Sequence, residues 1–143
     1  MPETIHFFVE KTPFAIPGKR ILRRWLENAI REENGVPGAI NFIICNDDYL
    51  LKMNKKYLKQ KTLTDILTFP MADDDKTISA DMYISIERIR DNSKKFKVQV
   101  KKELARVMIH GILHLLGYDD HDEEGMKKMR EKEDYYLAGL VLW

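Results

Sequence analysis

Histidines are concentrated in one short window of this 143-residue chain. Three of its four histidines lie in the segment His110-Gly-Ile-Leu-His-Leu-Leu-Gly-Tyr-Asp-Asp-His121. His110 and His114 are four residues apart, so on a helix their imidazoles lie about one turn apart on the same face. This spacing allows both rings to bind one metal ion.

The residues after His114 predict a sharp turn that brings back a third ligand. Gly117 is expected to end the helix, because glycine readily adopts the left-handed backbone of a C-terminal cap. Asp120 or His121 can then return toward the two histidines. Three protein ligands with an open fourth position are typical of a catalytic zinc site. The competing interpretation, two core histidines on an apolar helix, would require a buried hydrogen-bond partner for each ring.

The composition indicates a globular protein. Hydrophobic residues make up 44% of the chain and charged residues 33%, which is not the balance of a disordered segment. We expect residues 1–143 to form one domain, because this length is sufficient for a single core. The net charge of +1 provides no general attraction to nucleic acid or membrane, so an RNA site would depend on local clusters.

Cysteine content and the N-terminal sequence indicate a cytoplasmic location. Cys45 is the single cysteine, which excludes an intrachain disulfide and fits a reducing compartment. The chain begins without the pattern of a signal peptide and has no run apolar enough to span a bilayer. We therefore expect no membrane contact, and the oligomeric state stays open.

Hydrophobic periodicity and turn residues predict alternating strands and helices. Strands are expected at residues 5–9, 39–45, 64–70 and 81–86. Helices are expected at residues 17–34, 47–58, 85–97, 99–116 and 122–140. The simplest architecture is one α+β domain.

Two basic segments are candidates for RNA binding, at residues 52–61 and 94–102. Such charge runs are usually solvated surface, and they bind phosphate only if they meet near the site. Phe69 or Tyr83 offers a ring on which an unpaired base can stack, although aromatic residues in strands are more often part of the core.

Three segments of the chain form a recognisable series: Met-Asn-Lys-Lys-Tyr at 53–57 with Thr-Asp-Ile-Leu-Thr-Phe-Pro at 64–70, Ala-Asp-Met-Tyr-Ile-Ser at 80–85, and His-Gly-Ile-Leu-His-Leu-Leu-Gly-Tyr-Asp at 110–119. In this order they resemble the motifs of the YbeY family of bacterial rRNA-maturation endoribonucleases. The resemblance extends over most of the chain from Asn41 onward.

The resemblance implies a small mixed four-stranded sheet packed with about five helices, one of them a zincin-like helix with the His-x3-His spacing. It also implies one zinc ion per chain. The implied activity is single-strand-specific endoribonuclease cleavage in rRNA maturation and ribosome quality control, with rRNA and ribosomal particles as partners.

The chain departs from the family pattern at two positions. Where the family usually has a third histidine, ten residues after the first, this chain has Asp120, and His121 follows it. A carboxylate is an accepted zinc ligand, so the ungapped comparison favours Asp120 as third ligand, with His121 as the alternative. The second departure is Leu58, where many members have an arginine that is often viewed as catalytic. The phosphate must then be held by other cations, and the candidates are Lys55, Lys56, Lys59 and Lys61.

Two other functions compete with RNA cleavage. The histidine and glycine spacing also matches metzincin proteases, but Gly111 stands where those enzymes carry the glutamate that acts as general base. The remaining alternative is a ribosome assembly factor without catalysis, in which the metal only ties the helix to the following turn. Beyond the metal site, the sequence identifies no catalytic residue.

Overall fold

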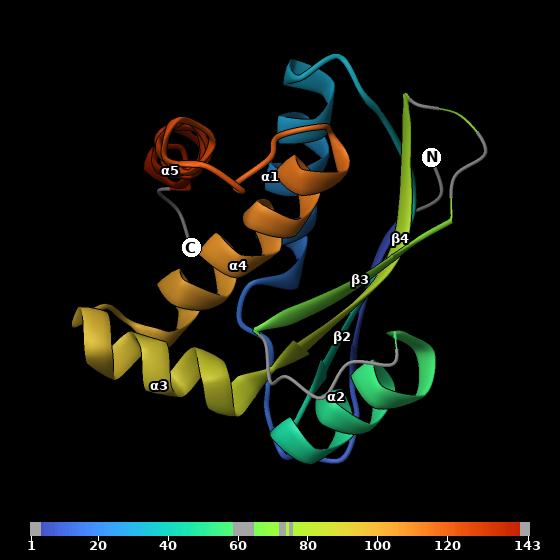
Figure 1. The fold of residues 1–143 in the computed structure, drawn as a ribbon, viewed down its shortest axis with the longest axis vertical. Coiled ribbons are helices and arrows are strands. Elements are labelled where there is room, and N and C mark those ends of the chain that lie inside the picture. The colour runs from blue at the N-terminus through green and yellow to red at the C-terminus, as the bar shows by residue number, and fades with distance from the viewer. Residues whose placement is uncertain (1–3, 59–64, 72–73, 75, 141–143) are drawn as a thin grey trace.

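A computed structural model describes residues 4–58, 65–71, 74 and 76–140 of the chain (Figure 1). Its elements, in order, are β1 (Ile5–Val9), α1 (Lys19–Glu32), β2 (Val36–Cys45), α2 (Asp47–Met53), η1 (Asn54–Leu58), β3 (Ile66–Pro70), β4 (Thr77–Ser85), α3 (Ile86–Phe96), α4 (Val100–Leu115) and α5 (Glu123–Ala138). Within the described residues there are thus five α-helices, one π-helical turn and four strands, which confirms the predicted α+β class.

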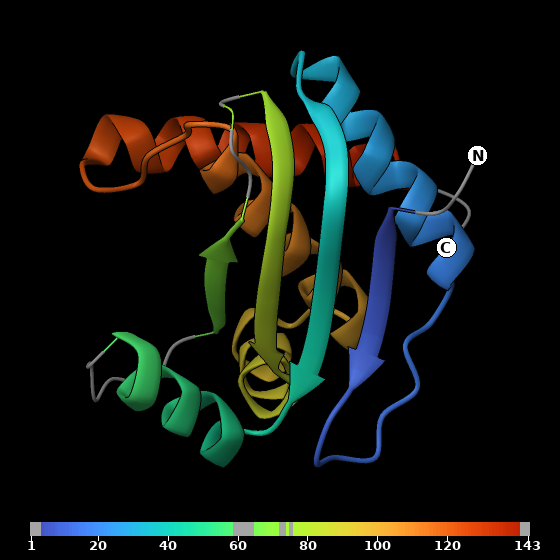
Figure 2. The ribbon, with the colours of Figure 1, turned by 90° about the vertical axis from the view of Figure 1, so that its right-hand side faces the viewer.

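The four strands form one mixed sheet in the order β1-β2-β4-β3. β1, β2 and β4 are parallel, whereas β3 pairs with β4 in the antiparallel direction and lies at the edge. α1 and α4 cover one face of the sheet, and α2 lies against the other face (Figure 2). Side chains of β3 alternate between these two faces, because successive residues of a strand point in opposite directions.

The main core lies between the sheet and the helices α1 and α4. Alternate residues of the two central strands are fully buried there: Ile40, Phe42 and Ile44 in β2, and Ala80, Met82 and Ile84 in β4. Each such side chain contributes roughly 1.5–3 kcal/mol on burial, with alanine contributing less.

Gly111 allows α4 to approach the sheet closely. A Cβ at this position would lie 2.9 Å from Cδ1 of Ile66 and 3.0 Å from Sδ of Met82, so a larger side chain would push the helix away from β3 and β4. The middle of α4 is therefore fixed against the edge of the sheet, one residue after His110.

The structure refines the predicted boundaries. β2 begins at Val36 rather than Ala39 because Pro37 and Gly38 are accommodated by a register shift against β4. β4 likewise begins at Thr77, and the helix predicted for residues 47–58 divides into α2 and the π-helical η1. The first strand matches its predicted bounds, and Asn46, Ser85 and Asp122 form the N-caps of α2, α3 and α5.

Among the described residues, no helix is both long and apolar enough to cross a membrane.

Candidate metal centre and active-site cleft

α4 carries the two predicted metal ligands on the side turned away from its buried apolar residues. Leu104, Met108 and Ile112 are fully buried, whereas His110 is partly buried and His114 is exposed. The side chain of His114 forms no hydrogen bond or ion pair with any residue that the structure describes. It is therefore available to an external ligand.

The turn after α4 follows the prediction from sequence. Gly117 has a φ of +108° and ends the helix, and the chain then returns along α4. Oδ2 of Asp120 lies 3.6 Å from Nε2 of His110. Two ligands of a tetrahedral zinc ion with ordinary bond lengths are about 3.4 Å apart. The His110 and Asp120 side chains are thus spaced as two ligands of one ion would be.

Two contacts hold the returning loop in place. The Tyr118 hydroxyl donates a hydrogen bond of 2.6 Å to Glu33, at the end of α1. At the start of α5, a Cβ on Gly125 would lie only 2.1 Å from the backbone oxygen of Asp119. The absence of a side chain at Gly125 lets α5 begin directly against the loop that carries Asp120.

His110 is held from its other side by a buried carboxylate on α5. Its Nδ1 lies 2.7 Å from Oε2 of Glu133, a side chain only 7% exposed. The second carboxylate oxygen, Oε1, accepts a bond of 2.8 Å from Arg106, which also pairs with Asp134. An ionised carboxylate can only accept, so Nδ1 donates to Glu133, and when the ring is neutral the lone pair of Nε2 is left free on the side of Asp120. Metal-binding histidines are commonly held in this way by an outer carboxylate.

The electrostatic surroundings of His110 favour a cation. The hydrogen bond to Glu133 raises the pKa of His110 and outweighs the opposite effect of burial. The charges of Asp120 and Asp65 raise this pKa further. Carboxylates from three different parts of the chain therefore act on one imidazole, and a divalent cation bound to Nε2 would offset their charge. His110 and Asp120 accordingly fit two ligands of the zinc ion expected from the sequence, whereas His114 does not belong to any group of three ligand atoms within 4.8 Å of one another among the described residues.

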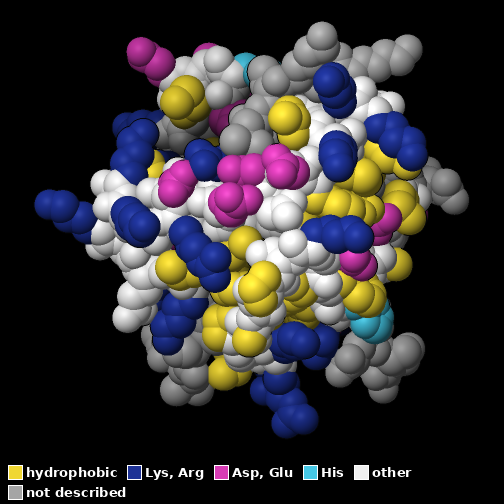
Figure 3. Space-filling view, turned by 90° about the horizontal axis from the view of Figure 1, so that it is seen from below, with side chains coloured by type: hydrophobic (Ala, Val, Ile, Leu, Met, Phe, Trp, Pro, Cys, Tyr) yellow, Lys and Arg dark blue, Asp and Glu magenta, His cyan; other side chains and the backbone are white. Residues whose placement is uncertain are grey.

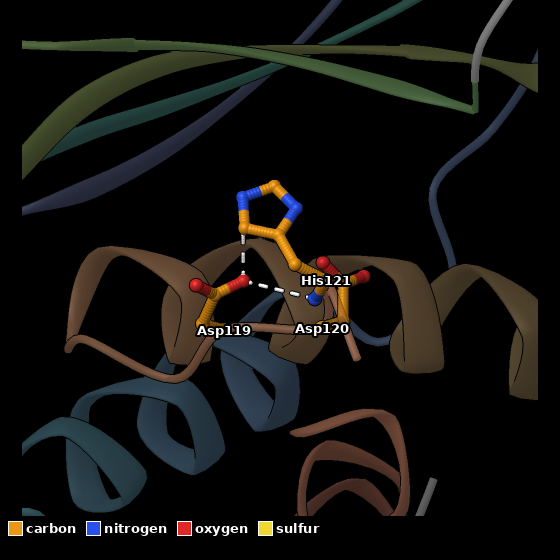
Figure 4. Close-up of side chains that lie close together, drawn as sticks. All are labelled: Asp119, Asp120 and His121. Carbon is orange, nitrogen blue, oxygen red and sulfur yellow. Dashed lines mark hydrogen bonds and ion pairs between the residues drawn. The ribbon is translucent and has the colours of Figure 1, made fainter. Parts of the chain in front are cut away.

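A second possible grouping of ligands lies on the loop itself. One potential ligand atom from each of Asp119, Asp120 and His121 lies within 4.8 Å of the others. Oδ1 of Asp119 accepts a bond of 3.0 Å from the backbone nitrogen of His121 and lies 3.4 Å from Nε2 of its ring (Figure 4). Asp120 therefore lies near His110 and also near His121, the residue predicted as the alternative third ligand.

The centre opens into a cleft of about 690 Å³. α4 lines it with Glu103, Arg106, Val107 and His110, and α5 with Met126, Met129, Arg130 and Glu133. Both sets follow the i, i+3, i+4, i+7 spacing of one helical face. The end of α3 and the start of β3 line its other sides.

Of the predicted phosphate-binding lysines, the two that the structure describes, Lys55 and Lys56, lie apart from this cleft. Lys55 and Lys56 are exposed on η1, where Tyr57 packs edge-on against Phe69. In β3, Ile66 contacts α4 whereas Phe69 belongs to the cluster on the opposite face. Lys55 and Lys56 therefore lie across the edge strand from the histidines. Lys59 and Lys61 lie outside the described residues.

Basic side chains do not form one continuous surface. On the face that contains α2 and α3, Lys and Arg side chains are widely spread and acidic side chains gather near the middle, in the part that the structure describes (Figure 3). Attraction of a polyanion to this face must therefore depend on individual cations. The two predicted stacking residues, Phe69 and Tyr83, pack against each other with their ring centres 5.7 Å apart. Both are partly buried, in the hydrophobic cluster on the α2 face of the sheet.

Comparison with known proteins identifies the family. The family model described as Endoribonuclease YbeY matches residues 10–141. The chain belongs to the YbeY family. A YbeY endoribonuclease from Amoebophilus asiaticus is 45% identical over 138 residues, covering 96% of this chain and 94% of the relative. Another, from Flavobacterium psychrophilum, is 48% identical over 113 residues, covering 79% and 80%.

A solved structure supports the same assignment. The solution structure of TM1509 from Thermotoga maritima matches with a TM-score of 0.67 and 30% sequence identity, covering 95% of this chain and 88% of that one. Membership of the YbeY family makes the chain an endoribonuclease, a hydrolase acting on RNA. The protease interpretation loses its basis. Gly111, at the position of the metzincin base, is buried against Ile66 and Met82.

Sequence reasoning missed Glu133 and Arg106. A signal for Glu133 was present in the spacing of α5. Met129, Glu133 and Tyr136 are its buried positions, so a glutamate occupies the apolar face of an amphipathic helix. Buried carboxylates require hydrogen-bond partners, so a glutamate at this position predicts a donor on a neighbouring helix.

Proposed function

We propose that this YbeY family member is a zinc-dependent endoribonuclease specific for single-stranded RNA. One zinc ion per chain is held by His110, His114 and Asp120, with His121 as the alternative third ligand. When bound, zinc supplies Lewis-acid chemistry, in that it activates water near neutral pH and polarises a phosphoryl oxygen. Both effects promote cleavage of an RNA phosphodiester.

The observation that carries this proposal is the position of the His110 ring between two carboxylates. Glu133 fixes Nδ1 at 2.7 Å, and Asp120 lies 3.6 Å from Nε2. In the neutral ring the proton is thereby held on Nδ1, while Nε2 is directed toward the second ligand. His114 is exposed one turn later on the same helix. These three residues would bind the ion once the exposed His114 ring turns toward the other two, and the cleft beside His110 and Asp120 leaves room for substrate.

RNA is also held by cations on the side of the edge strand opposite the histidines. The RNA strand crosses β3 after leaving the metal centre, and its phosphates on the far side of β3 are bound by Lys55 and Lys56, together with Lys59 and Lys61 of the adjoining sequence. These lysines take the place of the arginine that Leu58 replaces in the family pattern. Each phosphate contact adds about 0.7 to the salt dependence of single-strand binding.

The natural substrate in this proposal is rRNA within ribosomal particles, cut during maturation and quality control in the cytoplasm. A single domain comprising residues 1–143 performs the reaction. The near-neutral charge of the chain supports a target that is recognised through a defined site rather than by general attraction.

Cleavage assays on two substrates test the proposal. Wild type and His114→Ala, prepared identically and loaded with zinc, are each incubated with one labelled single-stranded RNA and one peptide. We expect RNA cleavage by wild type that a chelator abolishes and that His114→Ala lacks. RNA cleavage that survives the substitution would identify a contaminating ribonuclease, and peptide cleavage lost with His114 would identify a protease.

The proximity of Asp120 and His121 supports one other candidate function. If both side chains bind the ion together with His110 and His114, the zinc shell is closed, as in structural sites. The protein would then act as an assembly factor that binds ribosomal particles without cutting RNA. Binding of such particles with no metal-dependent cleavage of either substrate is the result that would favour this function.

A further inference from the structure

The outer end of the cleft exposes apolar side chains that the metal centre does not use. Phe96 is 53% exposed, Val98 44% and Met126 57%, and all three line the cleft that contains His110 and Asp120. They come from the end of α3, the following turn and the start of α5. Apolar groups gathered at the mouth of a cleft commonly mark a binding surface.

A cation without a protein partner lies in the same cleft. Arg130 is exposed and lines the cleft, and it forms no ion pair or hydrogen bond with any described residue. Arg106, on the opposite wall, is by contrast engaged by Glu133 and Asp134. At the apolar end, Nζ of Lys95 lies 5.4 Å from the centre of the Phe96 ring. Positive charge therefore accompanies the exposed aromatic ring.

The carboxylates of the cleft are already engaged at its floor. Asp65 accepts a bond of 3.1 Å from the Asn92 amide, and Glu133 is bonded to Arg106 and His110. Burial raises the pKa of Glu103, which disfavours its charged form. The floor is thus suited to a metal ion, and the rim combines the aromatic ring of Phe96 with the free cation of Arg130. That combination fits a nucleotide better than an apolar peptide, since a base offers a flat face and its phosphate a negative charge.

We propose that the rim of the cleft is a nucleotide subsite for single-stranded RNA. A base that flanks the cleaved phosphodiester stacks on Phe96, and the adjoining phosphate is bound by Arg130. Val98 and Met126 border the base. The requirement for an unpaired base explains selection of single strands, because a base within a duplex presents no free face to the ring. This inference rests on the proposed RNA-cleaving function.

Binding of a single-stranded RNA that contains 2-aminopurine tests the subsite. Phe96→Leu keeps an apolar side chain but removes the ring, and we expect RNA affinity to fall at least about fivefold, with loss of the fluorescence change caused by stacking. Arg130→Gln is expected to lower the slope of log affinity against log salt by about 0.7. Phe8→Leu, at a ring 49% exposed on β1, and Arg24→Gln, on α1, are matched controls expected to behave as wild type.

The outcomes separate this inference from the proposed function. If wild type does not bind or cut RNA, both are wrong. If wild type binds and cuts RNA and both cleft variants match it in affinity, fluorescence and salt slope, the subsite is overturned while the nuclease function stands. The apolar rim would then be assigned to a protein partner. Circular dichroism melts of all four variants establish that they are folded, as expected for substitutions of exposed side chains.

Discussion

Glu133 Oε2 lies 2.7 Å from Nδ1 of His110, and these two residues are on different helices. The contact joins α5 to the metal-binding face of α4 and determines which nitrogen of the ring is free. Arg106 holds the other oxygen of Glu133 at 2.8 Å, so the carboxylate itself cannot rotate without losing an ion pair. The orientation of His110 therefore depends on the packing of α5 as well as on α4.

Replacement of Glu133 is expected to weaken zinc binding without removing a ligand. Glu133→Ala should lower zinc affinity by about 10- to 100-fold, as is usual for the outer partners of metal-binding histidines. Glu133→Gln should have a smaller effect, because an amide oxygen can still accept from Nδ1. Chelator competition on the purified protein measures both affinities. Glu131→Gln, an exposed change on the same helix, is the control, and equal affinity for Glu133→Ala and wild type would contradict the positioning role.

Asp120 and His121 are separated by comparing their alanine variants. Since Asp120 lies 3.6 Å from Nε2 of His110, Asp120→Ala is expected to lower zinc affinity far more than His121→Ala. Elemental analysis gives the zinc content, and chelator competition gives the affinity. The reverse ranking would make His121 the third ligand, and similar large losses in both variants would indicate a closed shell.

The local part of the site was predictable from sequence because its determinants are local. Helical spacing places His110 and His114 on one face, and Gly117 permits the turn, so three positions within eight residues specify two of the three proposed ligands and the return of the chain toward the third. The helix caps were predictable for the same reason, since a side chain such as Asn46 bonds to a backbone group only three residues away.

The remainder depends on contacts between distant segments, which periodicity does not reveal. β4 lies between β2 and β3, although nothing in the sequence of those strands specifies their order. Glu133 is 23 residues from His110, and their contact follows from the packing of α5 on α4. The predicted role of residues 94–102 likewise changes. The lysines of this segment do not line the cleft, whereas Phe96 and Val98 do.

Gly125→Ala is expected to disturb the metal loop from outside the ligand set. A Cβ at this position would lie 2.1 Å from the backbone oxygen of Asp119, and a backbone atom cannot move aside as a flexible side chain can. Alanine normally favours a helix over glycine by about 1 kcal/mol, so a loss here would have to come from displacement of the loop. Zinc affinity is expected to fall while helix content is kept.

Gly139→Ala provides the matched comparison, because its Cβ would be at an ordinary 3.4 Å from the backbone oxygen of Tyr136. Chelator competition and circular dichroism are measured for both variants. Unchanged zinc affinity in Gly125→Ala would mean that the loop can shift without loss of a ligand, and that Asp120 does not depend on the close approach of α5.

Glu33 is expected to make the stability of the fold sensitive to acid. Its carboxylate accepts hydrogen bonds from Tyr118 at 2.6 Å and Lys132 at 3.1 Å, and from Tyr136. Burial alone would raise the pKa of Glu33, but these hydrogen bonds and the charge of Lys132 outweigh it and hold the pKa below 4.5. The unfolded chain therefore binds a proton at Glu33 more readily than the folded chain does.

By linkage, Glu33 contributes stability that is present above pH 4.5 and is lost as the pH falls through its lower folded pKa. Glu33→Gln removes the charge and is expected to cost about 1.5–3 kcal/mol at pH 7. Below pH 4.5 the free energies of unfolding of variant and wild type should converge. Urea denaturation between pH 3 and 7 measures this, with the exposed Glu32→Gln as control. If wild type and Glu33→Gln differ in free energy of unfolding by the same amount from pH 3 to 7, the hydrogen bonds to protonated Glu33 are as strong as those to its carboxylate. The charge of Glu33 would then not be what anchors Tyr118 and the metal loop.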